Sequence, residues 1–204
     1  MELNKFILFK INDFNCEFRN IIESDVSQDY VTGLKKHKEY IEKIPNHVSL
    51  MSQKKYVHEI HWSVDDTIFG LFVNNKLIGT SGVQSGVELL QYFQVPAKSI
   101  ATIGIFIFDE NYQKMGLGKT LVWASSYLFH CCTGSEWFGA GMKIKNIPSM
   151  RSFLSCGFRK INEDEDKCRV LINYSNLIKP GFIHGAEIRN NDNPSKKKMV
   201  ESLK

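Results

Sequence analysis

Residues 99–128 read S-I-A-T-I-G-I-F-I-F-D-E-N-Y-Q-K-M-G-L-G-K-T-L-V-W-A-S-S-Y-L, and this stretch decides the fold. Its first part, from Ile100 to Phe108, is apolar and rich in β-branched and aromatic residues, which predicts a buried strand. Asp109 to Asn111 break that pattern, and an apolar, helix-like segment starts at Thr120. The expected order is therefore a strand, a turn that carries glycines, and a helix.

The turn between this strand and this helix contains Gly116 and Gly118. Glycine lets the backbone come close to a ligand, and the start of a helix adds unpaired N–H groups and the positive end of the helix dipole. Together they predict a site for a phosphate or pyrophosphate group. A dinucleotide fingerprint needs a third glycine, and a Walker loop needs a glycine at the position of Gln113. The pattern that remains is Q-x-x-G-x-G, which begins at Gln113.

A second pattern lies downstream, where residues 146–158 read N-I-P-S-M-R-S-F-L-S-C-G-F. Together with Q-x-x-G-x-G it resembles the GNAT superfamily of acyl-CoA N-acetyltransferases, whose members carry N-x-x-[SA]-x-x-x-[YF]-x-x-x-G-F after the pyrophosphate loop. The resemblance covers roughly Phe18 to Tyr174 and is strongest from Ser99 to Phe158. It implies an α/β (α+β) fold with a central mixed, mostly antiparallel twisted sheet of about six to seven strands flanked by helices.

The resemblance also implies that acetyl-CoA is the co-substrate and indicates where it binds. The main chain at the end of the central strand would pair with the pantetheine arm, and one of its N–H groups would polarise the thioester carbonyl. The pyrophosphate would lie on the glycine loop, and the pantetheine region would pass the second pattern. The implied cofactor-binding residues are Ile105, Phe106, Ile107, Phe108, Gln113, Lys114, Met115, Gly116, Leu117, Gly118, Lys119, Asn146, Ser149 and Phe153.

The acid and the base of the transfer stay open. Many family members carry Tyr at the position of Phe153, and phenylalanine cannot donate a proton. CoA would then leave as a thiolate, which a thiol pKa near ~8.5 tolerates, or another group would protonate it. The attacking amine must lose a proton first, and Glu88 is our candidate base, with a water relay or an acceptor of lowered pKa as alternatives. The string H-E-I-H at His58–His61 lacks the H-E-x-x-H spacing, so we expect no metal.

The expected function is transfer of an acetyl group from acetyl-CoA to a primary amine of a small molecule or amino sugar, by direct attack in a ternary complex. The alternatives are an acetyltransferase of protein N-terminal or side-chain amines, a non-catalytic CoA-binding module of the same fold, and a nucleotide-binding domain of another class. Aromatic residues are candidates for the rim of an acceptor pocket: Tyr40, Tyr56, Trp62, Tyr92 and Phe93.

Length and composition set the remaining expectations. A chain of 204 residues suits one domain over residues 1–189, and the polar, basic tail over residues 190–204 is expected to be mobile. A net charge of +4 is mild, so we expect no nucleic-acid partner. There is no apolar run long enough for a membrane span and no signal peptide. Five cysteines without a C-x-x-C pattern fit reduced thiols in a cytoplasmic protein, and a homodimer is left open.

The hydrophobic pattern predicts further elements along the chain. An apolar run at Phe6–Phe9 is read as an extra edge strand or a packing arm. Strands are expected at Cys16–Ile22, Thr67–Val73, Leu77–Val83, Trp137–Lys145 and Asp166–Tyr174. Helices are expected within Val26–Ile44 and at Ser52–Trp62, Val87–Phe93, Thr120–Cys132 and Ser149–Ser155.

Overall fold

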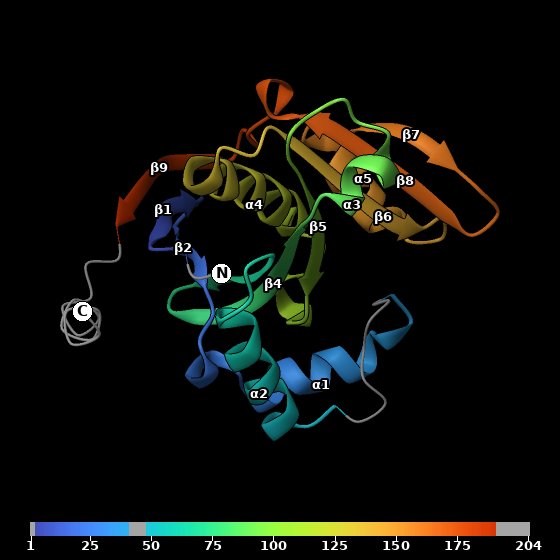
Figure 1. Ribbon diagram of the computed structural model, residues 1–204. Helices are drawn as coiled ribbons and strands as arrows, with labels where there is room; N and C mark the ends of the chain where they lie inside the picture. Colours follow the sequence, from blue (N-terminus) through green and yellow to red (C-terminus); the bar gives the residue numbers. More distant parts are fainter. Residues whose placement is uncertain (1–2, 41–47, 191–204) are drawn as a thin grey trace, which may run out of the picture.

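The structure is a computed structural model that describes residues 3–40 and 48–190 (Figure 1). The described residues form one sheet of nine strands in the order β7-β8-β6-β5-β4-β3-β2-β1-β9. The sheet is larger than expected because β7 and β9, at its two edges, were not foreseen. The strands are β1 (Lys5–Ile11), β2 (Phe14–Asn20), β3 (Asp66–Val73), β4 (Lys76–Ser85), β5 (Ile100–Ile107), β6 (Trp137–Lys143), β7 (Arg159–Glu163), β8 (Lys167–Asn173) and β9 (Ile183–Asn190).

Helices cover both faces of the sheet. The helices are α1 (Gln28–Lys36), α2 (Leu50–His61), α3 (Glu88–Phe93), α4 (Leu117–Thr133) and α5 (Ile147–Ser155), with short 3-10 turns η1 (Glu23–Asp25), η2 (Lys38–Tyr40), η3 (Glu110–Tyr112) and η4 (Tyr174–Asn176). In Figure 1, α4 lies above the sheet and α1 and α2 lie below it. No helix in the described part of the chain is long and apolar enough to cross a membrane.

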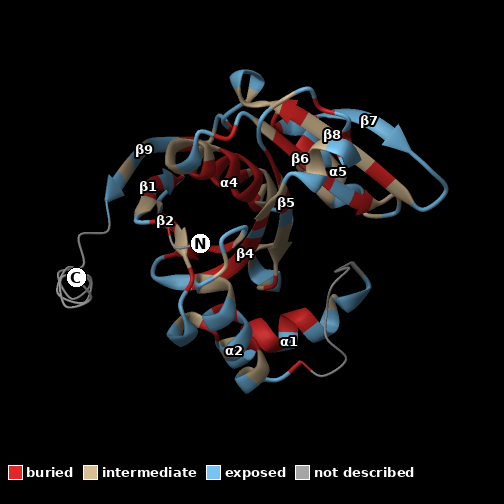
Figure 2. Cartoon of the chain, in the orientation of Figure 1, coloured by how far each residue is buried: buried red, intermediate tan, exposed pale blue. Residues whose placement is uncertain are grey.

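The two faces of β5 belong to two different clusters of apolar residues. Ile103, Ile105 and Ile107 pack in the cluster around α4, whereas Phe106 packs in the cluster formed by α1 and α2. This division follows from the alternation of side chains along a strand. Figure 2 shows the result, with buried residues concentrated on α4 and the central strands and with exposed residues along β7 and β9.

Local chemistry fixes the ends of several elements. The side chains of Ser27 and Ser49 accept hydrogen bonds from the N–H groups of Tyr30 and Ser52, and so cap α1 and α2. In the hairpin of β3 and β4, the turn residue Asn74 has φ 47°. Asparagine tolerates this left-handed conformation better than most residues.

The N-terminal run at Phe6–Phe9 is part of β1, and β1 is an internal strand. It pairs with β2 on one side and with β9 on the other, both antiparallel. The chain reaches β9 from η4, which follows β8 near the opposite edge, through a connection that we call the strap (residues 177–182). The strap passes the start of α4, because a Cβ atom on Gly116 would lie 3.3 Å from the ring of Phe182. The predicted tail lies outside the described residues, apart from Asn190, which ends β9.

Candidate functional site

The central feature of the sheet is a parting between β5 and β6. These neighbours run parallel, but they pair only at Ile100–Trp137, Ala101–Phe138 and Thr102–Gly139. Beyond Thr102, β5 stays paired with β4 as far as Ile107. The edge of β5 that faces β6 is therefore open over its last residues.

The hydrogen-bond pattern indicates which backbone groups point to this open edge. The N–H of Phe108 donates to the carbonyl of Ile78 at 3.2 Å, on the β4 side. Because these groups alternate in direction along an antiparallel pair, Phe106 also faces β4, while the N–H groups of Ile105 and Ile107 point to the open edge. The carbonyl of Ile107 is already occupied, because the side-chain amide of Gln113 donates to it at 3.2 Å.

The loop that follows β5 presents unpaired N–H groups at the start of α4. Lys114 and Gly116 have positive φ values of 62° and 79°, and α4 begins at Leu117 without a side-chain cap. Among the described residues, the N–H groups of residues 114–118 have no acceptor within the chain. Such a row of donors at a helix start suits a phosphate group.

Ion pairs fix the residues that connect β5 to this loop. Asp109 accepts a hydrogen bond from Lys76 Nζ at 2.7 Å and another from the N–H of Asn111 at 3.1 Å. Burial raises the pKa of Asp109, but these two partners outweigh it and hold the pKa below its ordinary value. The next residue, Glu110, forms an ion pair with Lys36 of α1, which lowers the pKa of its carboxyl.

On the face that carries α1, α2 and α3, three exposed glycines leave part of the sheet uncovered. Gly82 of β4 and Gly104 of β5 are register partners. A Cβ atom would meet nothing within 4 Å at Gly82 or at Gly141 of β6, and at Gly104 only the Gly82 carbonyl, at 4.0 Å. We call these residues the glycine strip. It lies beside the parting, so a molecule on it would reach the open edge of β5.

No family model matches the sequence, and no curated protein matches it. Solved structures do match. Mycobacterium smegmatis RimJ, in complex with CoA-disulfide, is 12% identical over 89% of this chain and 94% of that chain, with a TM-score of 0.69. RimL, a ribosomal L7/L12 alpha-N-protein acetyltransferase in complex with coenzyme A, is 16% identical over 81% and 97%, with a TM-score of 0.65. The GNAT domain of S. lividans PAT is 16% identical over 81% and 95%, with a TM-score of 0.61.

The chain has the GNAT fold. The predicted fold class is thereby confirmed, with nine strands among the described residues instead of about six to seven. Within this GNAT fold, the two sequence patterns lie on neighbouring helix starts. A Cβ atom on Gly118 would lie 2.5 Å from the hydroxyl oxygen of Ser152 in α5. Gly118 is therefore required for the contact between α4 and α5, a reason that the pattern alone did not reveal.

The residues predicted from the second pattern have structural partners in the GNAT fold. The side chain of Asn146 accepts a hydrogen bond from the N–H of Ser149 at 3.3 Å and so caps α5. Phe153 is only 1% exposed and its ring lies 5.0 Å from that of Phe158. The side chain of Phe153 is therefore part of the core and does not reach the loop surface.

The residues predicted on the loop differ in exposure. Lys114 and Met115 are exposed, Lys119 is half-buried, and Leu117 is buried in the core. The backbone N–H of Gln113 is not available to a ligand, because it donates to the carbonyl of Glu110 at 3.2 Å. Gln113 therefore fastens the loop to β5, and residues 114–118 supply the free donors.

Glu88 and the aromatic residues predicted for the acceptor pocket differ in position and in exposure. Glu88 is the first residue of α3, and its carboxylate is folded over Gly86. Phe93 is buried over Gly139, where a Cβ atom would lie 2.6 Å from its ring. Tyr92 accepts a hydrogen bond from Arg169 at 2.7 Å. Tyr56 and Trp62 are exposed, and the side chain of Tyr40 lies outside the described residues.

His37 is a residue near the parting that sequence reasoning missed. Its ring contacts Phe106 with centroids 5.9 Å apart, and its Nε2 lies 3.5 Å from the amide nitrogen of Gln113. A lone histidine at a helix end carries no recognisable pattern, so no signal marked it.

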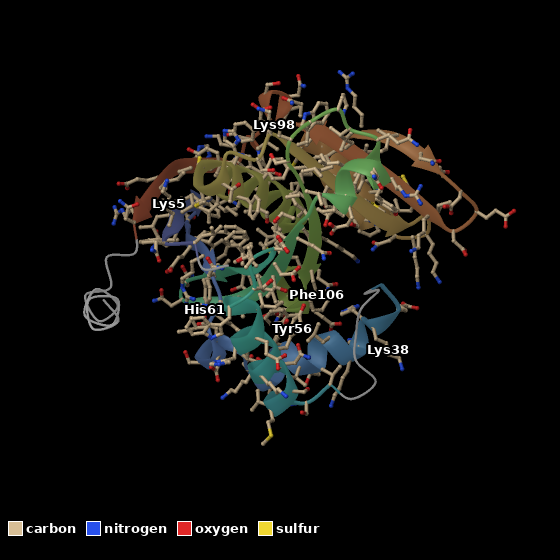
Figure 3. The ribbon with its side chains drawn as sticks, in the orientation of Figure 1. Lys5, Lys38, Tyr56, His61, Lys98 and Phe106 are labelled. Atoms are coloured by element: carbon tan, nitrogen blue, oxygen red, sulfur yellow. The ribbon has the colours of Figure 1, made fainter. Side chains whose placement is uncertain are left out.

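Figure 3 shows Phe106 and Tyr56 between the sheet and α2. Partial burial of the Tyr56 ring, followed by the charge of Asp66, raises the pKa of its hydroxyl, which is therefore protonated at neutral pH.

Three or more metal-ligating side chains do not come together anywhere in residues 3–40 and 48–190. All five cysteines are free thiols. Burial raises the pKa of Cys16 to about 11 and that of Cys156 to about 12, so both stay protonated and are poor nucleophiles.

Proposed function

We propose that this protein transfers an acetyl group from acetyl-CoA to a primary amine. The observation that carries the proposal is the parting of β5 from β6 after Thr102 and Gly139, next to a helix start whose N–H groups are unpaired. An extended acyl carrier fits the open edge as an added strand, and its phosphates fit residues 114–118. The CoA named with the similar RimJ and RimL structures supports the same assignment.

In this proposal the backbone performs most of the catalysis. The N–H of Ile105 or Ile107 donates to the thioester oxygen, where charge develops as the amine attacks. One such donor is worth about 3–4 kcal/mol in enzymes where it has been measured, and alignment of the two reactants is worth up to about 7–11 kcal/mol. The amine nitrogen forms the new C–N bond, the C–S bond breaks, and the sulfur leaves as a thiolate or takes a proton.

In this proposal the attacking amine becomes uncharged in one of three ways. Glu88 is exposed at the start of α3, on the face that carries the glycine strip, and it is our candidate base. A water relay and an acceptor amine of lowered pKa are the alternatives. Because β5 contributes no carboxylate and no histidine, a base must come from outside the strand or from solvent.

For the acceptor we favour a protein α-amine over the small amine or amino sugar that the sequence suggested first. Two observations support this choice. The glycine strip is an open part of the sheet surface without side chains. It suits an extended polypeptide because backbone can lie directly on backbone there. The similar RimL structure carries the name of an alpha-N-protein acetyltransferase of ribosomal L7/L12.

A thiol-release assay with acetyl-CoA and the full chain tests both the acetyl transfer and the class of acceptor. The panel contains short peptides with a free N-terminus, the same peptides with an acetylated N-terminus, polyamines and amino sugars. We expect turnover on free N-termini and none on blocked ones. Turnover confined to amino sugars or polyamines would overturn the acceptor class, and CoA binding without turnover on any amine would favour the non-catalytic module.

A further inference from the structure

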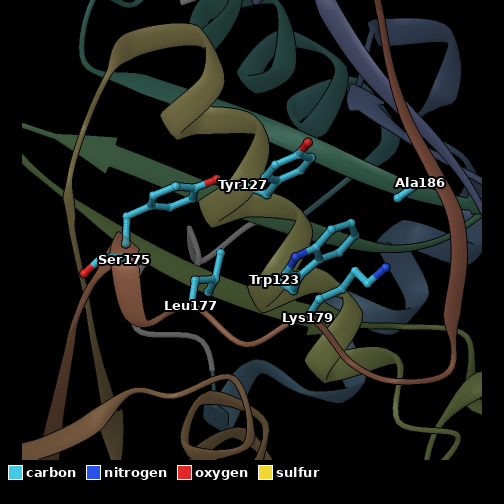
Figure 4. A pocket seen from close by; sticks show the side chains of 7 residues that line it. Trp123, Tyr127, Ser175, Leu177, Lys179 and Ala186 are labelled. Atoms are coloured by element: carbon cyan, nitrogen blue, oxygen red, sulfur yellow. The ribbon is translucent and has the colours of Figure 1, made fainter.

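A cavity lies beside α4 and away from the parting. Its volume is about 440 Å³, and its walls come from α4, η4, the strap and β9 (Figure 4). Its lining residues belong to neither the glycine loop nor the glycine strip. A cavity of this size falls in the range that small-molecule sites occupy.

Three of the seven residues that line this cavity are aromatic. The rings of Trp123 and Tyr127, one turn apart on α4, are stacked at 14° with centroids 5.3 Å apart. Tyr174 lines the cavity from η4, and its own ring is stacked on His130 at 13°. Tyr127 and Tyr174 are half-buried, so their rings offer flat surfaces that suit a planar aromatic ligand.

The polar groups of the cavity point to a negative charge on that ligand. Lys179 is the one charged residue in the lining, and its ammonium group has no carboxylate partner in the described part of the chain. Figure 4 shows its side chain extending alongside Trp123.

We propose that this cavity binds a small planar aromatic anion such as an aromatic carboxylate. The ring packs against Tyr127 and Tyr174, and the carboxylate accepts from Lys179. The inference is independent of the proposed acetyl transfer, because it uses none of the residues at the parting.

The test is a binding titration of the full chain with 2-naphthoate, using 2-acetylnaphthalene as the uncharged control. The chain has three tryptophans, so Trp62→Phe and Trp137→Phe leave Trp123 as the only tryptophan. We expect 2-naphthoate to change the Trp123 emission saturably and 2-acetylnaphthalene to bind at least tenfold more weakly. Equal affinity of the two compounds, or no saturable binding of 2-naphthoate, would overturn the proposal.

Two variants and one matched control locate the site. Lys179→Gln removes an exposed charge, and we expect it to weaken 2-naphthoate binding at least tenfold while 2-acetylnaphthalene changes less than twofold. Ala186→Leu fills the cavity and should weaken both compounds. Lys10→Gln is the control, because Lys10 is equally exposed but follows Phe9 in β1 and so points to the opposite face of the sheet. Displacement of 2-naphthoate by stoichiometric CoA, or unchanged affinity in Lys179→Gln, would assign the binding to another site and refute the proposal.

Discussion

Thr102 of β5 and Gly139 of β6 are the last residues that the two strands pair. Phe93 of α3 is buried against Gly139, at the point where the two strands part. Glycine at this position lets α3 pack close to the sheet at the point where the strands separate. The packing of α3 on the sheet therefore lies next to the parting of the two strands.

Gly104→Val should separate function from stability. A side chain at Gly104 meets no neighbour closer than 4.0 Å, and valine favours strands on a scale that spans ~1 kcal/mol. We therefore expect the free energy of unfolding to stay the same or to rise slightly in urea denaturation. If an acceptor lies on the glycine strip, kcat/KM for that acceptor should fall at least about tenfold, since ~1.4 kcal/mol of lost binding suffices.

The control for Gly104→Val is Gly70→Val in β3. A Cβ atom at Gly70 would lie 2.5 Å from Ile21 and 2.6 Å from Leu77, so this variant should lose about 1–3 kcal/mol of stability through overpacking. An unchanged kcat/KM in a folded Gly104→Val variant would show that the acceptor does not use the strip.

Gln113→Glu should loosen the loop from β5 in a pH-dependent way. The Gln113 amide donates to the Ile107 carbonyl at 3.2 Å, whereas an ionised carboxylate offers only acceptors. We expect the variant to lose about 1–3 kcal/mol of stability at pH 8. Part of this loss should be recovered near pH ~4, where an ordinary glutamate takes up a proton. Gln113→Leu serves as the control, because its loss should not depend on pH. Equal losses at both pH values in Gln113→Glu would contradict this role.

Asp109→Asn should reveal the ion pair with Lys76. The folded-state pKa of Asp109 lies below its ordinary value, so its charge stabilises the fold above the unfolded pKa of ~3.9, and this contribution is lost as pH falls through the folded pKa. Asparagine keeps the cap on η3 but removes the charge. Compared with the wild type, we expect a loss of about 0.2–1 kcal/mol at pH 7 that shrinks below pH ~3.9. Thermal unfolding across this range measures it, and a difference that grows on acidification would reverse the assigned sign.

The sequence predicted those parts of the fold whose signals are local. The strand expected at Ile100–Phe108 is β5, and it ends one residue early, at Ile107, although Phe108 still donates to the Ile78 carbonyl. The helix expected from Thr120 starts at Leu117, since Gly116 in the left-handed conformation precedes it. The strands β7 and β9 escaped notice because most of their residues are exposed, so they carry no apolar alternation.

In the candidate site, too, the sequence predicted only the parts whose signals are local. The glycine loop was recognisable because its residues are contiguous. The glycine strip was not, because it depends on the register that places Gly82 opposite Gly104. Asn146 and Phe153 belong to a recognisable pattern, but their side chains serve a helix cap and the core, respectively. A sequence pattern gives the identity of residues, and only packing decides which of their atoms stay available.

A double-mutant cycle on Gly118 and Ser152 should show that the loop conformation depends on the α4–α5 contact. The Cβ atom of Gly118→Ala would lie 2.5 Å from the Ser152 hydroxyl oxygen and 3.3 Å from its Cβ. We expect this variant to lose about 1–3 kcal/mol of stability and to bind CoA more weakly, because the N–H groups of residues 114–118 would shift with the helix start. Ser152→Ala alone should cost less, since its hydroxyl donates only to the carbonyl of Pro148 in the same helix.

In the double variant the closest contact is gone, and the remaining 3.3 Å contact with Cβ needs only a small adjustment. The stability and the CoA affinity should both return toward those of Ser152→Ala, with a coupling energy of about 0.5–3 kcal/mol. Denaturation and CoA titration of the four proteins provide the measurement. If the stability recovered while the CoA affinity did not, Gly118 would act on the ligand directly, and if neither recovered, the contact with Ser152 would not be what limits residue 118.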